Sequence, residues 1–161
     1  MSFFRSDELL NVGDLAPDFI ATLTTGETIS LNDYRGKKIV VLFFYPKDFT
    51  SGCTKQVCSF RDNYDQLLKY DVQLLGVSGD SENSHQEFVR RHNLPFPLIS
   101  DRDKSIARAY RTSNRFMGLL PGSKRVTYVI DKKGRIRGRV HHEVFIGKHI
   151  QEVLDAVKML P

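Results

Sequence analysis

Cysteine is scarce in this sequence, which has only Cys53 and Cys58 among its 161 residues. Long apolar runs are also missing, since no stretch approaches the length of a transmembrane helix and the N-terminus lacks the apolar core of a signal peptide. No Gly-x-Gly-x-x-Gly motif is present, and no internal repeat or linker divides the chain. These absences predict a single domain over residues 1–161, located in the cytoplasm, with no membrane partner and no flavin or nicotinamide cofactor.

Positive charge gathers in one region, and the formal net charge is +5. The basic residues of this region include Arg102, Lys104, Arg108, Arg111, Arg115, Lys124, Arg125, Lys132, Lys133, Arg135, Arg137 and Arg139. A nucleic-acid surface would account for them, and so would the solvated face of a helix and a hairpin. Because no nucleic-acid motif or aromatic stacking pattern accompanies the charges, we favour the solvated face and expect no nucleic-acid partner.

The most informative stretch is an apolar run followed by a proline and a cysteine. Residues 39–45 are rich in β-branched and aromatic side chains, which predicts a buried strand, and Pro46 ends it because proline cannot donate to a sheet. An amphipathic helix follows, with Thr50 or Ser51 in position to cap it. Cys53 then falls in the first turn, where unpaired backbone N–H groups and the helix dipole favour a thiolate. Cys53 is therefore a candidate nucleophile.

The second cysteine, Cys58, follows five residues later, and three interpretations of the pair compete. A structural disulfide is disfavoured because five residues along a helix separate the Cα atoms by about 8–9 Å, beyond the bridgeable range of about 7 Å. A zinc site needs three or four ligands, and no histidine lies near these cysteines in the sequence. The spacing and the helix position favour a redox pair, in which one sulfur reacts and the other resolves its oxidised form.

Strands and helices alternate along the rest of the chain and end in a hairpin and a helix. Strands are expected over residues 19–23, 28–31, 72–78, 126–131 and 136–140, an extended segment over 93–100, and helices over 81–92, 103–110 and 147–160. An irregular stretch is expected over residues 111–122. This order predicts an α/β protein with a central mixed sheet flanked by helices, as in a thioredoxin-like fold with an N-terminal hairpin extension.

Four segments, taken in order, resemble one known family. Residues 13–19, 44–54, 125–131 and 149–154 are similar to segments of the peroxiredoxins, within them the peroxiredoxin Q or bacterioferritin comigratory protein group. The second segment includes the family's Pro-x-x-x-Thr-x-x-Cys spacing at Pro46, Thr50 and Cys53. The resemblance covers nearly the whole chain. It departs from the group at Ser51, where proline is frequent, and at Gln56, where glutamate is frequent, and these positions bear on rate and reductant preference.

The resemblance implies reduction of hydrogen peroxide and organic hydroperoxides by a thiolate. Cys53 would attack the peroxide and become a sulfenic acid, which Cys58 would resolve as an intramolecular disulfide. Arg125 would favour the thiolate and donate to the peroxide, Thr50 would hold the peroxide by its hydroxyl, and Pro46 would shape and dry the pocket. Thioredoxin or glutaredoxin would reduce the disulfide, with no metal or other cofactor, and the protein would be a monomer.

Without the resemblance, several of these residues have simpler roles. Arg125 would be an exposed arginine of the hairpin, Thr50 a helix cap and Pro46 a strand terminator. His141 and His142 are adjacent histidines and more typical of a surface than of a metal site. Two other functions also stay open: a thioredoxin-like disulfide oxidoreductase, which generally needs a Cys-x-x-Cys motif, and a basic nucleic-acid-binding or chaperone module with a cysteine switch.

Overall fold

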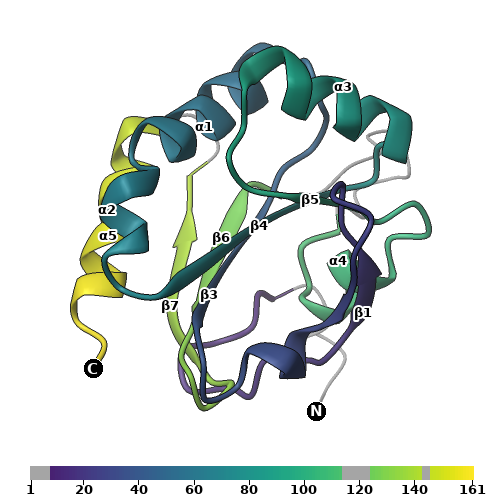
Figure 1. The fold of residues 1–161 in the computed structure, drawn as a ribbon. Helices are drawn as coiled ribbons and strands as arrows, with labels where there is room; N and C mark the ends of the chain where they lie inside the picture. The colour runs from purple at the N-terminus through teal and green to yellow at the C-terminus, as the bar shows by residue number, and fades with distance from the viewer. Residues whose placement is uncertain (1–7, 114–123, 143–145) are drawn as a thin grey trace.

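The fold is built on one mixed sheet of five strands (Figure 1), seen in a computed structural model that describes residues 8–113, 124–142 and 146–161. The strands are β3 (Ile39–Phe44), β4 (Val72–Ser78), β5 (Leu98–Ser100), β6 (Val126–Ile130) and β7 (Ile136–His141). Their order in the sheet is β5-β4-β3-β6-β7. β3, β4 and β5 run parallel, whereas β6 pairs antiparallel with β3 and β7 antiparallel with β6.

The central strand β3 is buried on both faces, which explains its unbroken apolar sequence. Val41 and Phe43 face a core shared with the helices α1 (Ser51–Asp62), α2 (Tyr64–Leu68) and α5 (Ile146–Lys158). Leu42 and Phe44 face a second core, shared with the N-terminal segment and α4 (Ser105–Ala109). Figure 1 shows α1, α2 and α5 on one side of the sheet and α4 on the other, so the sheet forms the middle layer.

A glycine in β4 leaves room for an aromatic ring that packs against α1. A Cβ atom at Gly76 would lie 2.5 Å from Phe43 Cζ and 2.6 Å from a Leu98 methyl carbon, distances that real side chains do not tolerate. The Phe43 ring therefore occupies the space over Gly76, and it stacks on Phe60 of α1 with the ring centroids 4.5 Å apart. This contact fixes α1 over the end of β3 from which its connecting loop departs.

The expected N-terminal hairpin is present as β1 (Ile20–Thr22) and β2 (Thr28–Ser30), followed by a 3-10 helix, η1 (Leu31–Tyr34). It attaches to the edge strand β5 of the main sheet. The Thr24 backbone N–H donates to the Leu98 carbonyl at 3.1 Å, and the Leu98 N–H donates to the Thr24 hydroxyl at 3.2 Å. The hairpin therefore covers an edge that would otherwise expose unpaired backbone groups.

The predicted α/β class and mixed sheet are confirmed, with one difference in the cysteine helix. That helix, expected to continue to near Tyr70, ends at Asp62, and α2 begins after Asn63. The Asn63 side-chain amide donates to the Ser59 carbonyl at 2.8 Å, a local hydrogen bond that competes with continuing the helix. Most of the predicted irregular stretch 111–122 lies outside the described residues. Among the helices that are described, none is long and apolar enough to span a membrane.

Candidate active site

Cys53 lies in the first turn of α1, as expected, and its side chain is fully buried. The loop 46–50 carries the chain from the end of β3 to Ser51, the first residue of the helix. The first turn of a helix has backbone N–H groups without intrahelical acceptors and a partial positive charge. The sulfur is thus removed from bulk water but lies where a negative charge is favoured.

Arg125 contacts the Cys53 sulfur directly. Its Nη1 lies 3.4 Å from Cys53 Sγ and donates a hydrogen bond to Gln56 Oε1 at 2.6 Å. Arg125 immediately precedes β6, and the antiparallel pairing of Phe43 with Thr127 brings this end of β6 beside the end of β3. The side chain is buried, so the interpretation of Arg125 as an exposed hairpin arginine is wrong. The guanidinium and the sulfur form a pair shielded from water.

Thr50 occupies the N-cap position of α1 but does not cap the helix with its side chain. Its hydroxyl instead donates to the Lys47 carbonyl at 2.8 Å, so the expected capping hydrogen bond is absent. The hydroxyl oxygen keeps lone pairs that can accept a hydrogen bond from a substrate. Thr50 is exposed and Pro46, just after β3, is half-buried, so both lie in the loop between the two elements that define the site.

Cys58 lies on the same continuous helix as Cys53, and both thiols are free. A disulfide between them is not present, in agreement with the geometric argument from the sequence. Cys58 is half-buried, and its Sγ lies 3.9 Å from Nδ1 of His92, the last residue of α3 (Glu82–His92). The two cysteines therefore have different polar neighbours, Arg125 for Cys53 and His92 for Cys58.

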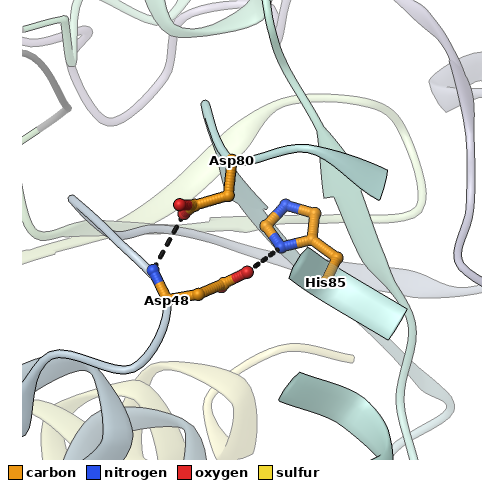
Figure 2. Close-up of side chains that lie close together, drawn as sticks. All are labelled: Asp48, Asp80 and His85. Atoms are coloured by element: carbon orange, nitrogen blue, oxygen red, sulfur yellow. Dashed lines mark hydrogen bonds and ion pairs between the residues drawn. The ribbon is translucent and has the colours of Figure 1, made fainter. Parts of the chain in front are cut away.

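The loop that leads to Cys53 is anchored by a buried polar network around Asp48 (Figure 2). Asp48 Oδ2 lies 2.7 Å from His85 Nδ1 and accepts the Ser84 hydroxyl at 2.8 Å, while Oδ1 accepts the Tyr45 hydroxyl at 2.6 Å. Burial, followed by the charge of Asp48, raises the pKa of Tyr45 well above its usual range, so this hydroxyl stays a donor. The Asp48 carboxylate ties the loop to β3 and to α3.

Asp80 and a backbone carbonyl complete this network. Asp80 Oδ2 accepts the Asp48 backbone N–H at 2.8 Å (Figure 2), and His85 Nε2 lies 3.0 Å from the Ile99 carbonyl. Both His85 nitrogens thus face oxygen atoms, Nδ1 that of the Asp48 carboxylate and Nε2 that of the Ile99 carbonyl. The three side chains are near enough to one another to hold a metal ion. An ion would have to displace these hydrogen bonds, so we interpret the group as a structural network.

The sequence interpretation singled out Gln56 only as a departure from the family pattern and assigned it no contact, and it overlooked His85 and His92. Gln56 lies three residues after Cys53, a spacing that places both on one face of a helix, so its proximity could have been predicted. His85 and His92 are seven residues apart, which also places them on one face of α3. Their partners Asp48 and Cys58 are distant in the sequence, and no local pattern indicates those contacts.

Of the two adjacent histidines, His141 is exposed and His142 is half-buried, close to the surface position expected for them. His141 is exposed at the end of β7, and His142 Nε2 lies 2.9 Å from a carboxylate oxygen of Glu152 on α5. Neither residue belongs to the one candidate metal cluster found among the described residues.

A thioredoxin-like sheet with a buried cysteine at the start of its first long helix, next to an arginine, is typical of proteins with thiol-dependent redox chemistry. The comparison with family models identifies the family: the AhpC/TSA family model matches residues 12–139. The chain therefore belongs to the AhpC/TSA family. It is an enzyme of the peroxiredoxin type, a peroxidase with two cysteines.

Known proteins of this type match the chain over most of its length. Peroxiredoxin Q of Populus jackii, a chloroplastic protein, is 40% identical over 151 residues, which cover 94% of this chain and 70% of the relative. The crystal structure of peroxidoxin BcpB from Mycobacterium tuberculosis superposes with a TM-score of 0.86 at 29% identity, covering 92% of this chain and 97% of the other. A bacterioferritin comigratory protein of Xanthomonas campestris, described for its alkyl peroxide reduction activity, gives a TM-score of 0.79 at 29% identity, covering 87% and 90%.

Proposed function

We propose that this protein reduces hydrogen peroxide and organic hydroperoxides with Cys53 as the nucleophile. The observation that carries the proposal is the buried Cys53 sulfur in the first turn of α1, with Arg125 Nη1 at 3.4 Å. A guanidinium and a helix N-terminus both favour the thiolate, which is the reactive form of cysteine. The alkyl peroxide reduction described for the Xanthomonas campestris protein supports organic hydroperoxides as part of the substrate range.

In the first step the Cys53 thiolate attacks one oxygen of the peroxide. The S–O bond forms as the O–O bond breaks, and the departing oxygen takes a proton to leave as water or an alcohol, with a sulfenic acid left on Cys53. Negative charge spreads over the sulfur and two oxygens in the transition state, and Arg125 is placed to stabilise it. Thr50 accepts the peroxide hydroxyl on its free lone pairs, and Pro46 shields the site without offering a competing N–H group.

In the second step Cys58 resolves the Cys53 sulfenic acid. Five residues of helix turn the chain by about 500°, so the two side chains point about 140° apart and lie too far from each other to bond. The first turns of α1 therefore unwind to bring the sulfurs together. The product is an intramolecular disulfide, and the sulfenic acid oxygen leaves as water.

The disulfide is then reduced by an external dithiol protein such as thioredoxin or glutaredoxin. This step needs a reducing compartment such as the cytoplasm, where a cycling dithiol can return to its free form. Both cysteines lie on one chain and on one helix, so a monomer has all the groups that the cycle needs. No metal ion or other cofactor takes part in either step.

Peroxide consumption in the presence of a dithiol reductant tests this proposal. We expect turnover of hydrogen peroxide and of an alkyl hydroperoxide by the native chain, and none by Cys53→Ser. The far-UV circular dichroism spectrum of Cys53→Ser should match that of the native chain, which shows that the variant is folded. An insulin-reduction assay on the same samples separates the runner-up function, a general disulfide oxidoreductase. Reduction of insulin without peroxide turnover would overturn the proposal in favour of that function, and turnover by Cys53→Ser would overturn the choice of nucleophile.

A further inference from the structure

The resolving cysteine has a histidine beside it. His92 Nδ1 lies 3.9 Å from Cys58 Sγ, and both side chains are half-buried. Two other contacts hold His92 in this position. Its ring meets Phe88 edge-on with the centroids 5.1 Å apart, and its backbone carbonyl accepts a hydrogen bond from Arg61 Nη1 at 2.7 Å. The ring contact and the backbone hydrogen bond together hold the His92 imidazole next to the Cys58 sulfur.

Cys58 lacks the features that favour a thiolate at Cys53. It lies in the middle of α1, beyond the first turn where the helix dipole acts, and the Arg125 guanidinium contacts the other sulfur. A cysteine attacks only as a thiolate, so Cys58 has to lose its proton before it can resolve a sulfenic acid. A neutral imidazole is the side chain best suited to take a proton near neutral pH.

We propose that His92 is the general base of the resolving step, an inference that rests on the proposed function. His92 Nδ1 takes the proton of the Cys58 thiol, and the thiolate attacks the Cys53 sulfur of the sulfenic acid. The S–S bond forms as the S–O bond breaks, and the leaving hydroxide takes the proton from the His92 imidazolium to become water. Cys58 is oxidised, the Cys53 sulfur is reduced to the disulfide level, and no proton or electron is left over.

The contacts of α1 are compatible with His92 acting on Cys58 during the unwinding. Arg61, one turn after Cys58, is bonded to the His92 carbonyl, so the second half of α1 is tied to the end of α3. Among the described residues, no hydrogen bond of this kind joins the first turns of α1 to α3. Cys53 therefore moves towards a Cys58 that stays beside its base.

Rapid quench of a single turnover separates the two chemical steps. Reduced protein is mixed with one equivalent of hydrogen peroxide and quenched, and peptide mass spectrometry follows the loss of the Cys53 thiol and the appearance of the Cys53–Cys58 disulfide. For His92→Gln and His92→Ala we expect the first rate to be unchanged and disulfide formation to slow by about 10²-fold, the usual contribution of a general base. Added imidazole should restore part of that rate in His92→Ala. Gln86→Ala, an exposed change on the same helix, is the matched control and should keep both rates.

Slow resolution has a second readout. The sulfenic acid would persist longer, so excess peroxide should convert more Cys53 to the sulfinic acid in both His92 variants than in the native chain. Disulfide formation at the native rate in His92→Gln, or an equal loss of both rates in both variants, would overturn the role of His92. A native chain whose Cys53 is not oxidised by peroxide at all would instead overturn the proposed function.

Discussion

Arg125 and Gln56 are the polar neighbours that the structure places at the Cys53 sulfur. One nitrogen of Arg125 contacts both Cys53 Sγ and Gln56 Oε1, so Gln56 aims the guanidinium at the sulfur. Gln56 is neutral, and the charge of Arg125 is therefore not offset at this contact. The guanidinium meets Cys53 in a buried site, where electrostatic interactions are strong.

Replacing Arg125 should slow peroxide reduction without removing the nucleophile. We expect Arg125→Ala to lower the rate of Cys53 oxidation by about 10²–10³-fold, as when a preorganised donor is lost from a transition state. Arg125→Lys should restore only part of the rate, because one ammonium cannot reproduce the planar set of guanidinium donors. Peroxide consumption gives the rate, and ultraviolet absorbance gives the thiolate population at each pH. An unchanged rate and thiolate population in Arg125→Ala would show that the contact has no catalytic role.

The contact of Arg125 with Cys53 is an example of what local sequence patterns could not predict. The helix position of Cys53 followed from Pro46 and the apolar run before it, because these are local signals. The contact between Arg125 and Cys53 joins residues 72 positions apart, and only the resemblance to peroxiredoxins suggested it. From local pattern Arg125 was one basic residue among many, and its burial depends on how β6 pairs with β3.

The buried pair of His85 and Asp48 should have a large effect on stability. His85→Leu leaves the buried Asp48 carboxylate without the imidazole that lies 2.7 Å from it, and loss of one partner of such a buried pair typically costs about 3–5 kcal/mol. Urea unfolding measures the free energy of unfolding of the native chain, of His85→Leu, of Asp48→Asn and of the double variant Asp48→Asn/His85→Leu. We expect the double variant to lose less than the sum of His85→Leu and Asp48→Asn, because the two groups interact. Additive losses would contradict a direct interaction.

At the scale of elements, the proposed cycle requires the cysteine helix α1 to be formed in the reduced protein and to open for disulfide formation. In the reduced protein it runs without a break from Ser51 to Asp62, through both cysteines. Most element boundaries were predicted to within a few residues, because strand and helix periodicities are local. The end of α1 was not, because the break depends on the hydrogen bond from the Asn63 side chain to Ser59.

Hydrogen exchange should detect the opening of α1. We expect amides of residues 51–57 to exchange faster in the oxidised protein than in the reduced one, since a Cys53–Cys58 disulfide cannot form on an intact helix. The opening should cost a few kcal/mol, within the range of local unfolding. Cys58→Ser treated with peroxide is the control and should keep its protection. Equal protection of residues 51–57 in a disulfide-bonded and a reduced sample would contradict the unwinding.

At the scale of the whole molecule, two apolar cores enclose the sheet, and buried tyrosines link the sheet to the segments that cover it. The Tyr128 hydroxyl donates to the Tyr110 carbonyl at 2.8 Å, and the Tyr110 hydroxyl donates to the Pro17 carbonyl at 2.6 Å. Burial raises the pKa of Tyr128 to about 12 and also raises that of Tyr110. Both groups are therefore held neutral in the folded protein.

These tyrosines should limit stability in alkali. Their folded-state pKa values lie above the unfolded value of about 10, so their contribution is complete below that pH and is lost as the pH rises towards about 12. Each tyrosine should lower the unfolding free energy by about 1.4 kcal/mol per pH unit in this range. Urea unfolding at a series of pH values measures the slope. Tyr110→Phe should reduce this slope by the contribution of one proton, about 1.4 kcal/mol per pH unit. An unchanged slope in that variant would contradict the assignment.

The most direct test of the central claim is to locate the first oxidised sulfur. Reduced native protein and Cys58→Ser are each treated with one equivalent of hydrogen peroxide, in the presence of dimedone for the variant, and their peptides are analysed by mass spectrometry. We predict a Cys53–Cys58 disulfide in the native chain and a dimedone adduct on Cys53 in the variant. An unmodified Cys53 in the Cys58→Ser variant, with the peroxide unconsumed, would contradict the assignment of Cys53 as the peroxidatic nucleophile.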